Sequence, residues 1–178
     1  MKVILIGLGG ASGNILNNIY ETSPNDFNYL YINQDKESID NSLIINKIHL
    51  DVKDNEEIIN SFNQMSASIL NYVKENDKVF VIAGLGGITG SKLLSHLGKL
   101  LKDNNYPSIG IVTKPFNYEG KARMEIAEES LEKAKHFFDK VEIFDNQSMF
   151  QYAEKETTFT EAFKEMDIRI KTYIENEI

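Results

Sequence analysis

The stretch GLGGASGN, residues 7–14, follows the apolar run VILI at 3–6, and the stretch AGLGGITGSK, residues 83–92, follows the apolar run VFVI at 79–82. Each run is short, apolar and closed by glycine, which is typical of a buried strand. A glycine-rich turn between a buried strand and a helix can present backbone N–H groups to a phosphate. The sequence therefore contains two candidate phosphate loops, each at the end of a strand.

Strand-like and helix-like segments alternate along the whole chain. The expected strands are residues 2–7, 27–33, 78–84, 108–113 and 140–146, with a weak strand within 44–50. The expected helices are residues 11–23, 36–41, 55–76, 89–104, 119–138 and 157–178, the last capped by Thr157 or Thr158. This alternation predicts an α/β fold with a three-layer, doubly wound, mostly parallel sheet. No linker or repeat divides the 178 residues, so we expect a single domain over residues 1–178.

Composition argues against several classes of protein. The net charge is -8, whereas binding to nucleic acid requires clustered Lys and Arg, so we expect no nucleic-acid partner. The chain has no cysteine, and its three histidines are scattered, so we expect no disulfide, thiol nucleophile or metal-binding cluster. The apolar runs are too short for a signal peptide or a membrane span, which predicts a cytoplasmic protein without a membrane partner.

Ligands of doubly wound sheets bind at the carboxyl ends of the strands. Both glycine loops fall at such ends, and so do INQD at residues 32–35, KPFNYEG at 114–120 and FDNQ at 144–147. Five strand ends should therefore meet at one edge and form one binding site.

The first loop alone nearly fits the dinucleotide fingerprint G-x-G-x-x-G, with Ser12 at the third glycine position. Asp35 follows the second strand, where an acid that binds a ribose would lie. An NAD-dependent oxidoreductase is thus one hypothesis, although no catalytic His, Lys or Tyr constellation supports it. A turn that only joins a strand to a helix explains this loop equally well.

The second glycine loop makes a dinucleotide site less favoured than the first loop alone suggests. It is not a P-loop, because Gly90 is followed by Ser91 and only then by Lys92. A dinucleotide fold has no standard use for a second glycine loop. Two phosphate cradles at adjacent strand ends favour one mononucleotide di- or triphosphate lying across the sheet edge.

Six segments in order along the chain resemble the tubulin/FtsZ GTPase family, most of all FtsZ. They are GLGGASGN, YINQD, VFVIAGLGGITGS, IGIVTKPFNYEGKARMEIAEE, IFDNQ and TTFTEAFKEMD. The resemblance implies a Rossmann-like GTPase domain that binds GTP or GDP, with Mg²⁺ as a further candidate ligand.

The resemblance also assigns roles to individual residues. Phosphate contacts fall to Gly9, Gly10, Gly13, Asn14, Gly86, Gly87, Thr89 and Gly90. Glu119 would accept hydrogen bonds from the ribose hydroxyls, with Asn33 on the ribose side, and Arg123 would reach ribose or phosphate one helical turn later. Glu119 and Arg123 could instead form an ordinary surface ion pair.

The base would be held from the last helix. Phe163 would stack on the purine, and the carboxylate of Asp167, four residues later, would accept from guanine N1–H and the 2-amino group. Adenine lacks this pair of donors, so the arrangement predicts guanine over adenine. Asn146 would add amide hydrogen bonds to the base. A core position for Phe163 is the rival interpretation.

The pattern departs from the family in several places. Ile88 and Lys92 replace two glycines of the signature loop, and a β-branched residue avoids positive φ. The Gly/Ala-rich loop expected before the long helix is absent, and the sequence ends at Ile178, so we expect the acidic catalytic loop and the second domain to be missing. Lys92 could bind phosphate or only pack.

Four functional hypotheses follow, of which one, motivated by Ile88 and the missing loop, is a degenerate scaffold that binds no nucleotide and only pairs with partners; the retained binding residues argue against it. The first is a truncated FtsZ-like domain that binds GTP or GDP, hydrolyses GTP slowly or not at all alone, and acts as a switch or modulator of a cell-division polymer with a full-length FtsZ-like partner. The second is a self-assembling GTPase whose site a neighbouring subunit completes. The NAD-dependent oxidoreductase is the third.

Overall fold

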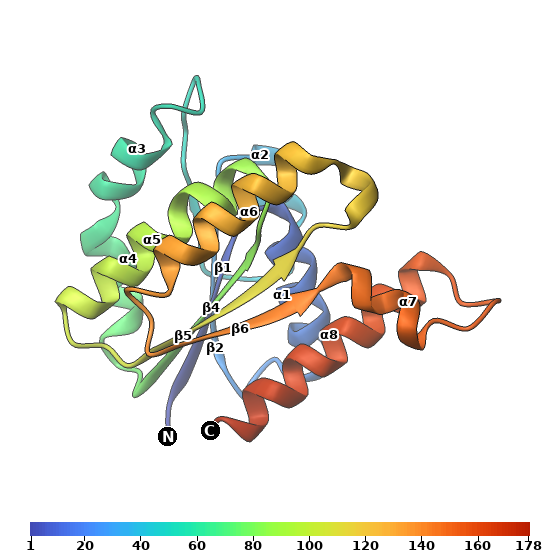
Figure 1. Cartoon of the computed structure of the whole chain (residues 1–178). Helices are drawn as coiled ribbons and strands as arrows, with labels where there is room; N and C mark the ends of the chain where they lie inside the picture. The colour runs from blue at the N-terminus through green and yellow to red at the C-terminus, as the bar shows by residue number, and fades with distance from the viewer.

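The computed structural model describes residues 1–178 and contains one sheet of six parallel strands in the order β3-β2-β1-β4-β5-β6 (Figure 1). The strands are β1 (Val3–Leu8), β2 (Asn28–Asn33), β3 (Lys47–His49), β4 (Lys78–Gly84), β5 (Ser108–Lys114) and β6 (Lys140–Asp145). The helices are α1 (Gly10–Thr22), α2 (Lys36–Asn41), α3 (Ile58–Gln64), α4 (Ser66–Val73), α5 (Ile88–Asp103), α6 (Lys121–Ala134), α7 (Met149–Tyr152) and α8 (Phe159–Asn176), with short 3₁₀ turns η1 (Asn117–Glu119) and η2 (Asn146–Ser148). The predicted parallel α/β fold is confirmed.

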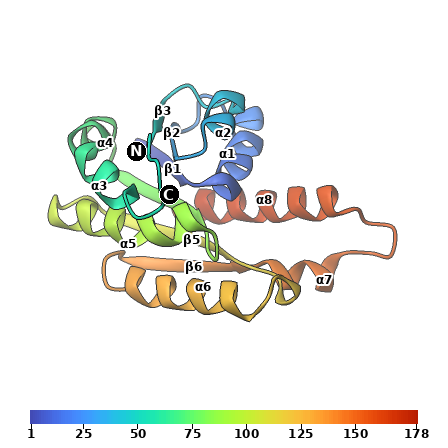
Figure 2. The same cartoon turned by 90° about the horizontal axis from the view of Figure 1, so that it is seen from above.

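Helices cover both faces of the sheet (Figure 2). Side chains of a strand alternate between its two faces. Ile4 and Ile6 of β1 therefore join a core cluster with residues of α3, α4, α5 and α6, whereas Val3 and Leu5 join a second cluster with residues of α1 and α8. The central strands are apolar on both faces because each face is covered, as expected for a parallel sheet.

The segment predicted as one helix over residues 55–76 is two helices, α3 and α4. Met65 lies between them at φ -92° and ψ 0°, and its N–H bonds to the carbonyl of Phe62 instead of continuing the i→i−4 ladder. Both helices bury apolar side chains against the sheet, among them Ile58, Phe62, Ile69 and Val73. The prediction of one continuous helix was wrong, because the spacing of apolar residues indicates which side of a helix is buried but not where the helix is interrupted.

Other boundaries differ in smaller ways. The weak strand exists as β3, a three-residue edge strand, and α6 is shorter at both ends than the predicted helix 119–138. The short α7 was not predicted. Thr158, and not Thr157, caps α8: its side chain accepts from the N–H of Glu161, whose carboxylate accepts from the N–H of Thr158. None of the helices combines the length and apolar character needed to span a membrane.

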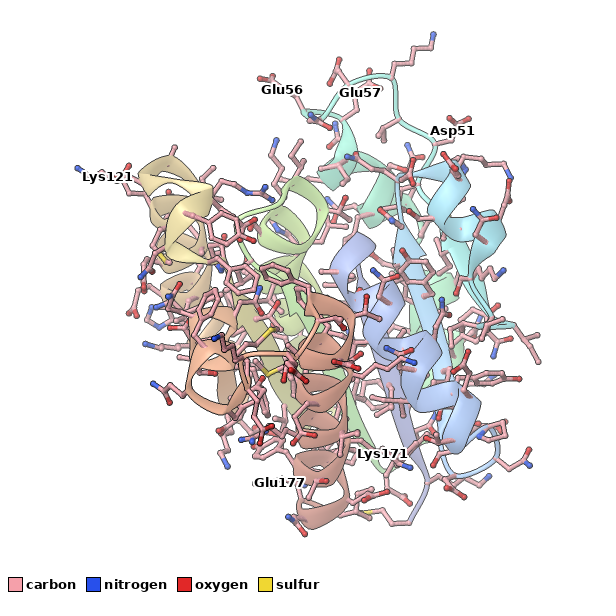
Figure 3. The ribbon with its side chains drawn as sticks, turned by 90° about the vertical axis from the view of Figure 1, so that its right-hand side faces the viewer. Asp51, Glu56, Glu57, Lys121, Lys171 and Glu177 are labelled. Carbon is pink, nitrogen blue, oxygen red and sulfur yellow. The ribbon has the colours of Figure 1, made fainter.

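The loop between β3 and α3 carries acidic side chains at one end of the molecule, where Asp51, Glu56 and Glu57 point outward (Figure 3). Two side chains hold this loop to the body of the protein. Gln34 Nε2 donates to Asn55 Oδ1 at 3.1 Å, and Lys92 Nζ donates to the Asn55 carbonyl at 2.9 Å. Lys92 thus holds a loop and is not part of the glycine-lined cavity described below.

The two glycine loops contact each other because β1 and β4 are neighbours in the sheet, with Leu8 opposite Ala83. A Cβ on Gly90 would lie 2.5 Å from the carbonyl oxygen of Gly84, and a Cβ on Gly84 would lie 2.6 Å from Cβ of Ala11. Both distances are far below van der Waals contact. Glycine at these two positions is what allows the N-termini of α1 and α5 to converge on the ends of β1 and β4.

This contact predicts that Gly90→Ala destabilises the fold by about 1–3 kcal/mol, because the methyl group meets backbone that cannot yield cheaply. Urea denaturation measures the effect. Gly10→Ala is the matched control: no atom lies within 4 Å of a Cβ there, and alanine favours helix over glycine by up to about 1 kcal/mol. Equal stability of the two variants would contradict this account of the contact.

Candidate functional site

A cavity of about 460 Å³ lies at the carboxyl edge of the sheet. Its walls come from the segments that follow β1, β2, β4, β5 and β6, as the convergence of strand ends predicts. The predicted site residues that line it are Gly9, Gly10, Asn33, Gly87, Thr89, Gly90, Glu119, Arg123 and Asn146.

The N-termini of two helices open into this cavity. Gly9 precedes α1 and Gly87 precedes α5, and no side chain caps either helix. The first-turn N–H groups of a helix have no intrahelical acceptor and carry a partial positive charge. Gly9 adopts φ 84°, a conformation that glycine allows at little cost. Together the two helices form a site suited to an anion with several oxygens.

A second cavity, of about 780 Å³, lies between α1 and α8. It shares Ala11, Thr113, Glu119 and Asn146 with the first cavity, so the two are adjoining compartments of one cleft. The predicted residues that line the second compartment are Asn14, Glu119, Asn146, Phe163 and Asp167. The cleft therefore has two unlike ends. At the first, backbone N–H groups of two helix N-termini are exposed, and the second, which is larger, has aromatic walls.

Asp167 is the buried carboxylate of the second compartment. It is only 6% exposed, and its Oδ2 accepts a hydrogen bond from Nδ2 of Asn18 at 2.5 Å. Burial raises the pKa of Asp167 to about 6, while the hydrogen bond from Asn18 opposes that rise. Figure 3 shows α1 and α8 side by side, with Lys171 in the region where they meet; Lys171 Nζ donates to Thr22 Oγ1 at 3.2 Å.

Aromatic rings form one wall of this compartment. Phe163 is 41% exposed, and its ring lies edge-on to the buried Phe116 at 6.0 Å. Tyr118 stacks on Phe116 at 5.1 Å with an interplanar angle of 14°. Phe163 is thus not a core residue: its ring remains available for stacking on a flat ligand.

Glu119 stands where the two compartments meet. One carboxylate oxygen accepts from the N–H of Phe116 at 2.7 Å, and the other lies 3.4 Å from Nη1 of Arg123. The predicted i,i+4 pair therefore exists, and both members line the cleft. These contacts orient Glu119 and leave lone pairs for a hydroxyl ligand.

Asn33 shapes the cleft through its own hydrogen bonds. Its Nδ2 donates to the hydroxyl of Tyr31 at 2.8 Å, and its Oδ1 accepts from the N–H of Gln34 at 2.8 Å. Asn146 opens η2, whose N-terminus is capped by the side chain of Asp145. Asn146 borders both compartments.

Two predicted phosphate contacts lie outside the walls of these compartments. A Cβ on Gly13 would lie 2.5 Å from the hydroxyl of Tyr31, so Gly13 permits that ring to pack against α1. The N–H of Gly86 donates to Oγ of Ser91 at 2.9 Å. The phosphate roles of Gly13 and Gly86 stay predictions, and each has a packing role in the structure.

Ile88 replaces a glycine of the signature loop and would be strained if the backbone there required a positive φ. Asn105 is the one residue other than glycine with positive φ, so Ile88, the first residue of α5, needs no left-handed conformation. Its side chain lines the first compartment and is 45% exposed. A glycine is therefore not required at this position.

Among the residues of the second compartment that sequence reasoning missed are Asn17, Asn18 and Tyr118. A signal was present, because Asn14, Asn17 and Asn18 are spaced i, i+3, i+4 and so share one face of α1. Three amides on one helix face next to a glycine loop indicate a polar ligand rather than core packing.

The structure contains no group of three or more His, Asp or Glu side chains that could hold a metal ion.

Comparison with protein families gives one match: residues 2–154 match the model of the tubulin/FtsZ family, GTPase domain. Cell division protein FtsZ of Rickettsia conorii is 32% identical over 174 residues, which cover 93% of this chain and 38% of that protein. FtsZ of a Wolbachia species is 29% identical, with 93% and 47% covered. The chain spans less than half the length of these relatives.

Solved structures agree in fold. An empty FtsZ dimer from M. jannaschii matches 93% of this chain and 51% of its own, with a TM-score of 0.81 and 26% identity. A W319Y mutant of M. jannaschii FtsZ matches 97% and 55%, with a TM-score of 0.85 and 25% identity.

The buried carboxylate predicts an unusual pH dependence of stability. Because the pKa of Asp167 is higher in the folded chain, about 6 against an ordinary 3.8, the native state binds more protons between these values. The contribution of Asp167 to the free energy of unfolding therefore falls as the pH rises from about 4 to 6. Asp167→Asn keeps an acceptor for Asn18 without the charge, so it should be more stable than the wild type at neutral pH by about 1–3 kcal/mol.

Urea denaturation without ligand at about pH 4 and pH 7.5 tests this expectation. The advantage of Asp167→Asn should shrink toward the acidic pH. Glu165→Gln makes the same chemical change on an exposed position of α8 and should have little effect at either pH. A wild-type protein that is more stable than Asp167→Asn at neutral pH would refute the assignment.

Proposed function

Because the chain belongs to the tubulin/FtsZ family, we propose that it is a guanine-nucleotide-binding domain that holds GTP or GDP in the two-compartment cleft. The main support for this proposal is that the two compartments of the cleft differ in chemistry as the two ends of a nucleotide do. One end has two uncapped helix N-termini, and the other has a buried carboxylate beside exposed aromatic rings. A nucleotide has these same two ends, an anion and a flat base with N–H donors.

The phosphates would lie in the first compartment against the N-termini of α1 and α5. Gly9, Gly10, Gly87, Thr89 and Gly90 line this compartment. Backbone N–H groups can bind the oxygens without a basic side chain, which suits a chain of net charge -8. Arg123 is the cation at this wall, and its guanidinium would add a charge-assisted hydrogen bond.

The ribose would lie at the junction of the compartments, where Glu119 can accept from its hydroxyls. The base would enter the second compartment and stack on Phe163. There Asp167 would accept from guanine N1–H and the 2-amino group, and Asn146 would offer an amide contact. Asn14, predicted from the sequence to contact the phosphates, lines this second compartment instead of the first, so we propose that its amide contacts the base. Adenine would leave the buried carboxylate without its pair of donors, which is costly.

Mg²⁺ fits the proposal only as a companion of the phosphates. Protein side chains bind it weakly here because acidic groups do not cluster. Mg²⁺ in nucleotide sites is commonly held by phosphate oxygens and water.

We further propose that GTP hydrolysis by the isolated chain is slow or absent. Two carboxylates line the first compartment, and both are already engaged. Glu119 accepts from Phe116 N–H and pairs with Arg123, and Asp35 caps α2 by accepting from the N–H and hydroxyl of Ser38. These contacts hold both carboxylates in place, so we expect neither to position the attacking water for catalysis. A role as switch or modulator, through self-association or a full-length FtsZ-like partner, would follow from binding without turnover.

The same cleft favours one alternative, a GTPase whose site a neighbouring copy completes, because the first compartment is open and both of its carboxylates are held by contacts within the protein. The oxidoreductase hypothesis has less support: Asp35 caps α2 through its Oδ2, and no His, Lys or Tyr side chain lines the first compartment.

Calorimetric titration of nucleotide-stripped protein tests binding. GDP and GTP should bind with micromolar affinity or better, about -8 kcal/mol, and ADP should bind far more weakly. Asp167→Asn should lose at least about 10-fold in GDP affinity, since an amide cannot accept from both donors of guanine. Glu165→Gln, on the exposed side of the same helix, should bind like the wild type. Equal binding of GDP and ADP by the wild type would refute guanine recognition.

Steady-state phosphate release separates the two proposals on turnover. A domain without a complete catalytic site should release phosphate at a very low specific rate that does not change with protein concentration. A rate that rises faster than linearly with protein concentration would instead favour completion by a neighbouring copy. Arg123→Ala serves as a binding-defective control, so residual release by that variant marks contaminating activity.

A further inference from the structure

We infer that Asn18 and Asp167 act as one unit that determines which purine the cleft accepts, with Asn18 as the positioning residue that keeps Asp167 in its acceptor form. This inference rests on the proposed function, because it concerns the base compartment of the same cleft. It goes further by adding a second residue and a dependence of purine choice on protonation.

The contact between the two residues joins distant parts of the chain. Asn18 on α1 and Asp167 on α8 are 149 residues apart, and Asn18 Nδ2 donates to Asp167 Oδ2 at 2.5 Å. No other hydrogen bond reaches this carboxylate, and both residues line the base compartment. Because one amide orients the carboxylate, it also determines which lone pairs of the two oxygens face a ligand.

None of the charged side chains near the carboxylate of Asp167 takes over the stabilising contact that Asn18 makes. Lys164 and Lys171 lie on α8, Glu21 lies on α1, and all three border cavities that Asp167 also borders. Lys171 is engaged with Thr22 and Glu175. Neither lysine forms an ion pair with Asp167.

From η1, Glu119 faces the same compartment and is held by Phe116 and Arg123. Two effects therefore set the pKa of Asp167. Burial raises it, the hydrogen bond from Asn18 lowers it, and burial is the larger effect, so the pKa is about 6. The carboxyl group can thus change protonation within a modest range of pH.

The ionised and the protonated forms of Asp167 match the hydrogen-bonding groups of different bases. The ionised carboxylate offers two acceptors, which match the N1–H and 2-amino donors of guanine. The protonated acid offers one O–H donor and one acceptor, which match N1 and the 6-amino group of adenine. Asn18 donates a hydrogen bond and so favours the ionised, guanine-reading state.

The test is the ratio of GDP to ADP affinity as a function of pH, measured by calorimetry. Titration of the phosphates affects both nucleotides alike and cancels in the ratio. In the wild type the ratio should fall about 10-fold for each unit by which the pH is lowered, because it follows the ratio of ionised to protonated Asp167. Asn18→Leu should raise the pKa of Asp167 by about one unit, so the ratio should be about 10-fold lower than in the wild type at each pH, including near neutral pH.

Thr22→Val is the matched control on α1. It removes a hydrogen bond to Lys171 and not to Asp167, so the ratio at each pH should stay that of the wild type. An unchanged ratio in Asn18→Leu, or a ratio that is flat with pH while GDP still binds, would overturn the inference and leave the proposed function intact.

A second measurement does not need a nucleotide. Carbon-13 NMR titration of the Asp167 side-chain carboxyl in the free protein should give a midpoint near pH 6 for the wild type and Thr22→Val, and a higher one for Asn18→Leu. The same midpoint in all three proteins would overturn the role of Asn18. Failure of the wild type to bind GDP at any pH would overturn the proposed function, and purine selection by this pair with it.

Discussion

The close contact between Gly84 and Gly90 is the constraint on which the rest of the site depends. It places the start of α5 against the end of β4, directly beside the start of α1. A methyl group at either position would separate these segments, because backbone and Ala11 stand in its way. Only with this contact do two helix N-termini open into one cavity, and only then can several oxygens of one ligand meet both sets of amides.

The features that suit the cleft to a ligand are costly without one. Two helices start without a capping side chain, Tyr118 and Phe163 expose large rings, and Asp167 is buried with a pKa of about 6. Each feature costs folding free energy. They gather at one edge of a sheet whose interior is otherwise apolar on both faces, which indicates that the edge is shaped for binding and the remainder for stability.

The local patterns of the sequence predicted much of this arrangement. Buried strands closed by glycine identified the carboxyl edge, and alternation of strands and helices identified the parallel sheet. The i,i+4 spacings of Glu119 with Arg123 and of Phe163 with Asp167 correctly brought each pair to the cleft. These inferences succeed because the periods of strand and helix, and the backbone freedom of glycine, are properties of short segments.

The sequence by itself therefore determined the order of the elements, the edge of the sheet at which the cleft lies and several of the residues that line it. Tertiary structure alone decided that Asn18 pairs with Asp167, that Gly13 makes room for Tyr31, and that the predicted helix 55–76 breaks at Met65. The physical reason is that each of these depends on which elements become neighbours. A hydrogen bond across 149 residues, or a missing methyl group under a ring, leaves no periodic signal in either segment and exists only once the layers have packed.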